Sequence, residues 1–229
     1  MHRAGEGCPM ADRLLFSKTG RAKYMSHRDL MRTFQRAFTR ADIPIRATVG
    51  LHPHSFVSIL LPLPVGHSSQ CELLEFGLEA PQDREALPTR LNAALPEGIV
   101  VHRCYPAEQG RDKLAAVNYI INFEYPEGRP QETEPAMQAL LEQDRLMVSK
   151  RSPATGAPVR FDAAPLIRGW NLECQSDTMT LDVVLSAQNP GLNPELLRAA
   201  FCQTYPELTP DFVTFHRREV LDAGGRVFR

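Results

Sequence analysis

The fold of this chain is set by its opening stretch, residues 14–41, which reads LLFSKTGRAKYMSHRDLMRTFQRAFTRA. Its first residues place Leu14, Phe16 and Lys18 at alternate positions. Alternation with a period of two is typical of a β-strand, because successive side chains of a strand point to opposite faces. The run ends at Gly20, so a short strand followed by a turn is predicted here.

A helix is predicted directly after this turn. Ser26 stands three residues before Asp29, which is a variant of the capping box that begins helices. Apolar residues then recur at the spacing of one helix face, at Leu30, Met31, Phe34, Ala37, Phe38 and Ala41. The pattern ends near Asp42, ahead of Pro44, and therefore predicts an amphipathic helix over residues 26–41.

Two similar series of elements follow each other along the chain. After the first strand and helix, strands are predicted at 55–61, 71–78 and 99–105, with a helix at 83–95 that Pro88 kinks or starts. A second series has strands at 117–125, 145–150, 179–185 and 212–220 and helices at 134–143 and 193–201. Both have the β-α-β-β-α-β order of ferredoxin-like domains.

The predicted fold class is therefore α+β, with two tandem ferredoxin-like domains. Residues 1–10 are expected to be disordered, 11–106 to form the first domain and 113–229 the second. A polar linker separates them, and a Pro/Gly-rich insertion at 152–158 interrupts the second.

Composition limits the function classes. No apolar run approaches the roughly 20 residues of a membrane span, so a soluble protein is expected. The five cysteines stand singly, without a CxxC pair, which argues against disulfides and structural zinc and favours the cytoplasm. No phosphate-binding glycine loop, serine elbow or HExxH motif is present, and we expect no cofactor or metal.

Positive charge is concentrated at the start of the chain. Residues 1–50 contain ten Lys or Arg and four Asp or Glu, although the whole chain has a formal net charge of only −1. Within the predicted helix, Arg28, Arg32, Arg36 and Arg40 recur every four residues and share one face opposite the apolar stripe. The sequence therefore predicts a locally basic surface on a protein whose net charge is close to zero.

This surface is a candidate binding site for phosphate groups, because guanidinium groups match phosphate geometry and several contacts add affinity. The predicted binding residues are Arg21, Lys23, His27, Arg28, Arg32, Arg36, Arg40, Arg46, His52 and His54. The alternative is a solvated helix face whose arginines pair with acidic residues of the second domain.

Three of these residues are histidines that also suit acid–base chemistry. His27 lies at the start of the helix, while His52 and His54 flank a proline in the next loop. They could bind a metal, act as general acid and base, or contact RNA or another ligand; otherwise they are structural loop residues.

A weaker group of candidates lies in the second half of the chain. Arg160, Asp162, Arg168 and Trp170 could form a small polar pocket in which the indole stacks on a planar ligand. We favour the alternative that the only tryptophan packs in the core of its domain.

Residues 13–34, with the Gly50-Leu51-His52-Pro53-His54 loop and Leu61 to Gly66, resemble the radical-SAM-linked family called domain of unknown function 2344. Matching positions are Gly20, Ser26, His27, Asp29, Gly50, Pro53, His54 and Gly66, whereas Leu51 and His52 depart from the family motif. The departure at His52 leaves His27 and His54 as the catalytic candidates. The resemblance implies a radical-SAM enzyme as partner, often one with a cobalamin-binding domain.

Three functions remain open at this point. The leading one is an accessory protein that binds an anionic substrate such as tRNA or rRNA for a radical-SAM enzyme. The chain is not expected to be that enzyme, because it lacks the closely spaced cysteine triplet of a site-differentiated iron–sulfur cluster. The second is a metal-independent endoribonuclease, for which His27, His54 and Lys23 could supply acid–base groups. The third is a purely structural partner of the radical-SAM enzyme.

Overall fold

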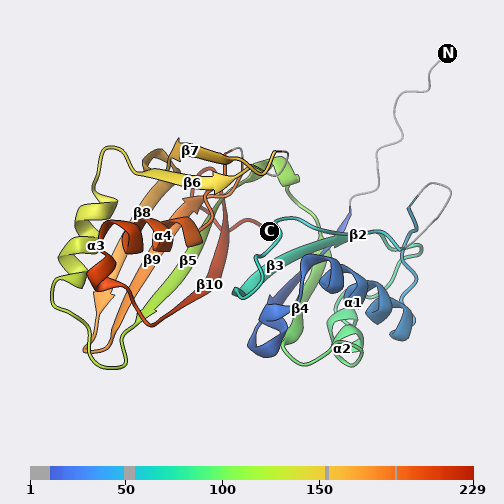
Figure 1. The fold of residues 1–229 in the computed structure, drawn as a ribbon. Helices are drawn as coiled ribbons and strands as arrows, with labels where there is room; N and C mark the ends of the chain where they lie inside the picture. The colour runs from blue at the N-terminus through green and yellow to red at the C-terminus, as the bar shows by residue number, and fades with distance from the viewer. Residues whose placement is uncertain (1–10, 49–54, 153–154, 189) are drawn as a thin grey trace, which may run out of the picture. The chain divides into compact units, whose positions relative to one another are not determined.

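The computed structural model describes residues 11–48, 55–152, 155–188 and 190–229. The chain divides into two compact units, one of residues 1–111 with Arg229 and one of residues 112–228 (Figure 1). Each unit combines an antiparallel sheet with two α-helices, so the α+β class predicted from the sequence is confirmed.

The first unit has the predicted order of elements. These are β1 (Asp12–Lys18), the 3-10 helix η1 (Gly20–Tyr24), α1 (His27–Arg40), β2 (Val57–Ile59), β3 (Ser68–Phe76), α2 (Leu87–Asn92) and β4 (Ile99–Pro106), followed by a 3-10 turn, η2 (Arg111–Lys113). Its strands lie in the order β4-β1-β3, with β2 paired to β3, and each of these pairings is antiparallel. Pro88 stands at the start of α2, so it marks the first turn of that helix instead of kinking it.

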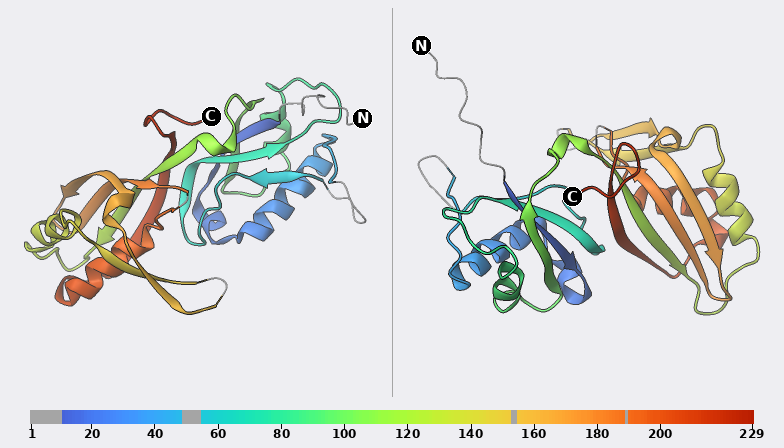
Figure 2. Two further views of the ribbon diagram at one scale, coloured as in Figure 1. Left: turned by 90° about the horizontal axis from the view of Figure 1, so that it is seen from above. Right: turned by 180° about the vertical axis from the view of Figure 1, so that it is seen from behind.

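Both helices of this unit lie against its sheet (Figures 1 and 2). The two helices and the sheet share one hydrophobic core. Phe34 of α1 meets Phe16 of β1 with ring centroids 4.8 Å apart, and Phe38 meets Phe76 of β3 at the same distance. All four side chains are buried. The apolar stripe predicted for the helix is thus its packing face, and the opposite face is left to solvent.

The second unit repeats this pattern with an added hairpin. Its elements are β5 (Leu114–Glu124), α3 (Thr133–Leu141), β6 (Met147–Arg151), β7 (Pro158–Asp162), η3 (Ala164–Leu166), β8 (Ile167–Cys174), β9 (Thr178–Ser186), α4 (Glu195–Thr204), η4 (Pro206–Leu208) and β10 (Phe212–Asp222). The main sheet has the order β10-β5-β9-β8, with antiparallel pairings, and Phe123 of β5 packs against Phe201 of α4.

The strand predicted at 145–150 is confirmed, but its expected place in the domain was wrong, because it does not join this sheet. The segment forms β6, which pairs only with β7 as a separate two-stranded sheet. The place beside β9 is taken by β8, which the sequence analysis did not identify. The physical reason is that β8 lies at the sheet edge and alternates half-buried with exposed residues, so it lacks a clear apolar face.

Gly98 lies between α2 and β4 and packs against Thr19, the residue between the end of β1 and the start of η1. Its φ is +86°, and a Cβ placed on it would lie 2.5 Å from the backbone oxygen of Thr19 and 3.0 Å from the Cβ of Ala22. The Gly98 carbonyl also accepts a hydrogen bond from the backbone N–H of Thr19 at 2.8 Å. Only glycine fits this contact, because it lacks a Cβ and tolerates positive φ.

Changing Gly98 to Ala is expected to lower the free energy of unfolding by about 2–3 kcal/mol, from backbone strain and from the clash with Thr19. Gly20 is the matched control: its φ is +53° but nothing lies within 4 Å of the added Cβ. Gly20→Ala should therefore cost only about 1 kcal/mol. Urea unfolding followed by circular dichroism measures both, and equal losses would contradict the steric argument.

Candidate functional site

The start of α1 is fixed by its N-cap. The Ser26 hydroxyl accepts a hydrogen bond from the backbone N–H of Asp29 at 3.2 Å and donates one to the Asp29 carboxylate at 2.7 Å. The cap satisfies one N–H of the first helical turn, which otherwise has no partner within the helix. Because the cap and the buried stripe fix the helix rotation, the positions of the arginines on the outer side are fixed as well.

Arg28, Arg32 and Arg36 are all exposed on α1, and we call these three residues the arginine face. Arg32 lies 4.0 Å from the Asp29 carboxylate, and both side chains are about 60% exposed. An ion pair so open to water contributes little to stability. Within the described residues of the first unit, Arg28 and Arg36 contact no carboxylate, so their guanidinium groups are available to a ligand.

Arg40 has a different role, although it continues the same spacing. Its guanidinium donates a hydrogen bond to the backbone oxygen of Ala94, just after α2, at 2.6 Å. In return, Arg90 of α2 donates to the backbone oxygens of Ala41 and Asp42, each at 2.8 Å. Cations at helix C-termini satisfy free carbonyls and oppose the negative end of the helix dipole. Arg40 is therefore a structural cap, which makes it a weaker binding candidate than the sequence suggested.

The turn before α1 adds further positive charge. Arg21 is exposed, and the Nζ of Lys23 lies 5.1 Å from the centre of the Tyr24 ring. His27 occupies the first helical position and is exposed, and it forms no hydrogen bond with the described residues of its unit. Tyr24, which the sequence analysis overlooked, is 65% exposed. The only sequence signal for it was a single aromatic residue within a basic, polar stretch.

Of the three candidate histidines, His27 lies within the described residues. His52 and His54 lie outside the described residues, and so do Gly50, Leu51 and Pro53 of the same motif. In the portions of the chain that the structure describes, no group of three or more His, Cys, Asp or Glu residues could hold a metal ion. Acid–base catalysis by His27 and His54 stays a prediction.

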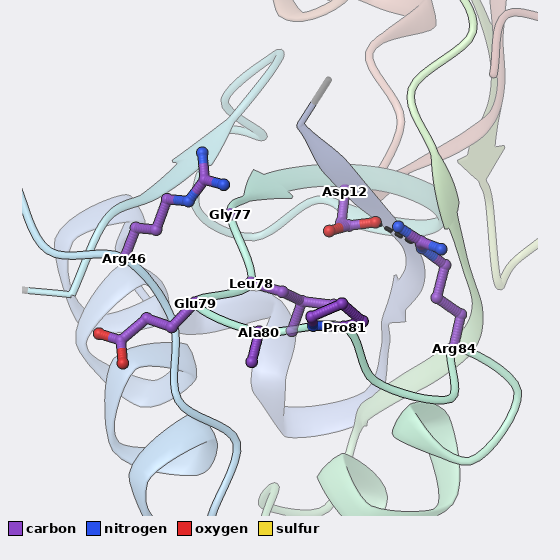
Figure 3. Close-up of a pocket in the computed structure, with 8 residues that line it drawn as sticks. All are labelled: Asp12, Arg46, Gly77, Leu78, Glu79, Ala80, Pro81 and Arg84. Carbon is purple, nitrogen blue, oxygen red and sulfur yellow. Dashed lines mark hydrogen bonds and ion pairs between the residues drawn. The ribbon is translucent and has the colours of Figure 1, made fainter. Parts of the chain in front are cut away.

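Arg46 lines a pocket of about 380 Å³ in the first unit (Figure 3). Arg84, on the opposite side, donates a hydrogen bond to the buried carboxylate of Asp12 at 2.6 Å. Leu78, Ala80 and Pro81 form the wall between them. The guanidinium of Arg84 is thus neutralised by Asp12, whereas Arg46 forms no ion pair among the described residues of its unit.

The thiol of Cys104, which interacts electrostatically with Asp12 and Arg84 of this pocket, is unsuited to nucleophilic chemistry. Burial raises the pKa of Cys104 to about 12, and the negative charge of Asp12 acts in the same direction. A raised pKa keeps the thiol protonated at neutral pH, and the thiolate is the reactive form. Cys104 therefore packs as a small apolar residue.

Two of the candidate residues of the second unit form local hydrogen bonds. The Asp162 carboxylate accepts hydrogen bonds from the backbone N–H groups of Leu146 and Ala164, both at 3.0 Å, so it stabilises the local turn. Arg168 donates to the hydroxyl of Ser186 at 3.2 Å, and Arg160 is exposed. Trp170 is half-buried on β8 and is not among the fully buried core residues.

None of the helices in the described segments has the length and apolar character needed to cross a membrane.

Replacing Arg40 by Gln is expected to lower the free energy of unfolding by about 0.5–1.5 kcal/mol, because the carbonyl of Ala94 loses a charged donor. Arg36→Gln is the matched control, one turn earlier on α1, and should stay within about 0.5 kcal/mol of the parent. Urea unfolding compares the two. An equal effect of both changes would contradict the capping role of Arg40.

Cys104 is expected to react with iodoacetamide at pH 8 at least about 100-fold more slowly in the folded protein than in urea, because its raised pKa leaves little thiolate. Peptide mass spectrometry after timed labelling measures both rates. Labelling of the folded protein at the unfolded rate would show that Cys104 is accessible and ionised.

Comparison with known proteins gives one family assignment. No curated protein matches the sequence. A crystal structure of an unknown protein from Galdieria sulphuraria aligns with 91% of this chain and 98% of its own, at 10% identity, but its TM-score of 0.27 is too low to support an argument. A family model described as "Uncharacterized protein conserved in bacteria (DUF2344)" matches residues 13–194, and the chain therefore belongs to this family.

Proposed function

We propose that this chain is a cytoplasmic accessory protein that binds an anionic substrate, RNA, for modification by a radical-SAM enzyme. The observation that supports RNA binding most directly is the arginine face: three exposed guanidinium groups at successive turns of one rigid helix. Like charges at this spacing destabilise a helix, so an anionic partner would relieve an unfavourable interaction. The radical-SAM partner is inferred from the family resemblance of residues 13–34.

We also propose that each unit is a ferredoxin-like domain. The strand orders β4-β1-β3-β2 and β10-β5-β9-β8, with antiparallel pairings and two helices per unit, support this. Such a domain buries one face of each helix on its sheet and leaves the other face to solvent. For α1, the face left to solvent is the one that presents the arginines.

The test is a fluorescence-anisotropy titration of labelled bulk tRNA with the parent protein and a triple variant, Arg28→Gln, Arg32→Gln and Arg36→Gln. We expect the triple variant to bind at least about 10-fold more weakly at moderate salt, because three phosphate contacts are lost. Arg40 is left unchanged so that loss of a helix cap is not mistaken for loss of binding.

A matched control carries Arg145→Gln, Arg151→Gln and Arg160→Gln, three exposed arginines of the second unit. It has the same net charge as the first variant and should bind within about 3-fold of the parent if the contacts are local. Equal losses in the two variants, or no binding by the parent, would overturn the proposal. Cleaved tRNA on a gel would instead indicate the endoribonuclease. Co-purification with the radical-SAM enzyme, without RNA binding, would indicate the purely structural partner.

A further inference from the structure

Tyr24 is a large aromatic side chain that the fold leaves in water. It ends η1, two residues before the N-cap of α1, and it is 65% exposed. Its neighbours Arg21, His27 and Arg28 are exposed and polar. An exposed aromatic ring among basic groups is the arrangement with which proteins bind unpaired nucleobases, because a base can stack on the ring while its phosphates contact the cations.

The backbone around Tyr24 is held rigidly by a buried lysine. Lys18, only 1% exposed, donates from its Nζ to the backbone oxygen of Lys23 at 3.2 Å and to that of Met25 at 2.9 Å. These two carbonyls belong to the residues on either side of Tyr24. Burying an ammonium group is unfavourable unless it is hydrogen-bonded, and these two carbonyls supply the hydrogen bonds that Lys18 needs.

Two further hydrogen bonds fix the same turn. The backbone N–H of Gly66 donates to the Lys23 oxygen at 2.8 Å, and the N–H of Met25 donates to the Ala22 oxygen at 2.9 Å. The main chain on both sides of Tyr24 is thus tied to β1 and to the segment before β3. A side chain presented from a fixed backbone loses less entropy when a ligand binds to it.

We infer that the RNA element recognised by this surface is single-stranded, with one nucleobase stacked on Tyr24 and the adjoining phosphates bound by Arg28 and its basic neighbours. This inference rests on the proposed function and narrows it from RNA in general to an unpaired segment. In a duplex the bases are stacked on each other and their faces are closed to a protein ring. Lys23 lies over the Tyr24 ring at 5.1 Å, so a stacking base takes the place of Lys23 or uses the other face.

The first test compares a labelled single-stranded 12-nucleotide RNA with the duplex of the same sequence, for the parent and for Tyr24→Ala. We expect the parent to prefer the single strand, and Tyr24→Ala to weaken single-strand binding roughly 5- to 150-fold while changing duplex binding less than about 3-fold. Tyr24→Phe keeps the ring and should bind within about 3-fold of the parent. Because the side chain is exposed, these variants should unfold at the parent's urea midpoint.

Phe212 offers a matched control, since it is an exposed aromatic residue of the second unit at 62% exposure. Phe212→Ala should leave single-strand affinity unchanged. A loss equal to that of Tyr24→Ala would contradict a specific stacking site.

A direct readout uses tryptophan fluorescence. Trp170 is the only tryptophan, so a Trp170→Phe background with Tyr24→Trp places a single indole at the proposed stacking position. Saturating single-stranded RNA should quench this indole strongly, and the duplex should not. Absence of quenching at saturation would overturn the stacking arrangement.

The outcomes separate this inference from the function on which it rests. The single-strand inference fails, and the RNA-binding proposal stands, if the triple variant at Arg28, Arg32 and Arg36 loses RNA binding while Tyr24→Ala does not. The same conclusion follows if Tyr24→Ala weakens the binding of both RNA forms equally. If neither RNA form binds the parent, both fail. In that case capture of the radical-SAM enzyme by the parent, and its loss in Tyr24→Ala, would identify the exposed ring as a protein contact.

Discussion

The candidate site depends on the packing of α1 against the sheet of its own unit. Phe34 and Phe38 pack on Phe16 and Phe76 at 4.8 Å, and these contacts set the rotation of the helix about its axis. Once the rotation is fixed, a repeat of four residues places every arginine of the series on the outer side. The basic surface is thus a direct consequence of how the core is filled.

Exposure alone does not make an arginine available to a ligand. Arg40 and Arg90 exchange hydrogen bonds with the ends of each other's helices, which ties α1 to α2 through backbone carbonyls. Arg46 lines a pocket, and Arg84 is paired with a buried carboxylate. On α1 the arginine face is exposed, and among the described residues of the first unit its one ion pair is the open contact of Arg32 with Asp29. The fixed turn with Tyr24 stands directly before this face.

The sequence predicted an element correctly where a periodic pattern of apolar residues was accompanied by clear start and stop signals. The helix at 26–41 was predictable because its cap, apolar period and end signals agree. The edge strand β8 was missed because it has no well-buried face, and β6 was misplaced because a short polar strand gives no sign of its partner. Lys18 stands in the same alternation as Leu14 and Phe16, yet the sequence could not show that its ammonium group binds the turn before α1. For the same reason the exposure of Tyr24 could not be predicted, since it depends on contacts distant in sequence.

The central claim is that Arg28, Arg32 and Arg36 contact phosphates. Its most direct test is the salt dependence of single-stranded RNA affinity, plotted as the logarithm of the association constant against the logarithm of salt concentration, for the parent and the triple Gln variant. Each phosphate contact to a single strand contributes about −0.7 to the slope, so the account predicts that the variant's slope is shallower by roughly 2. Equal slopes would show that the three arginines do not contact the backbone and would contradict the account.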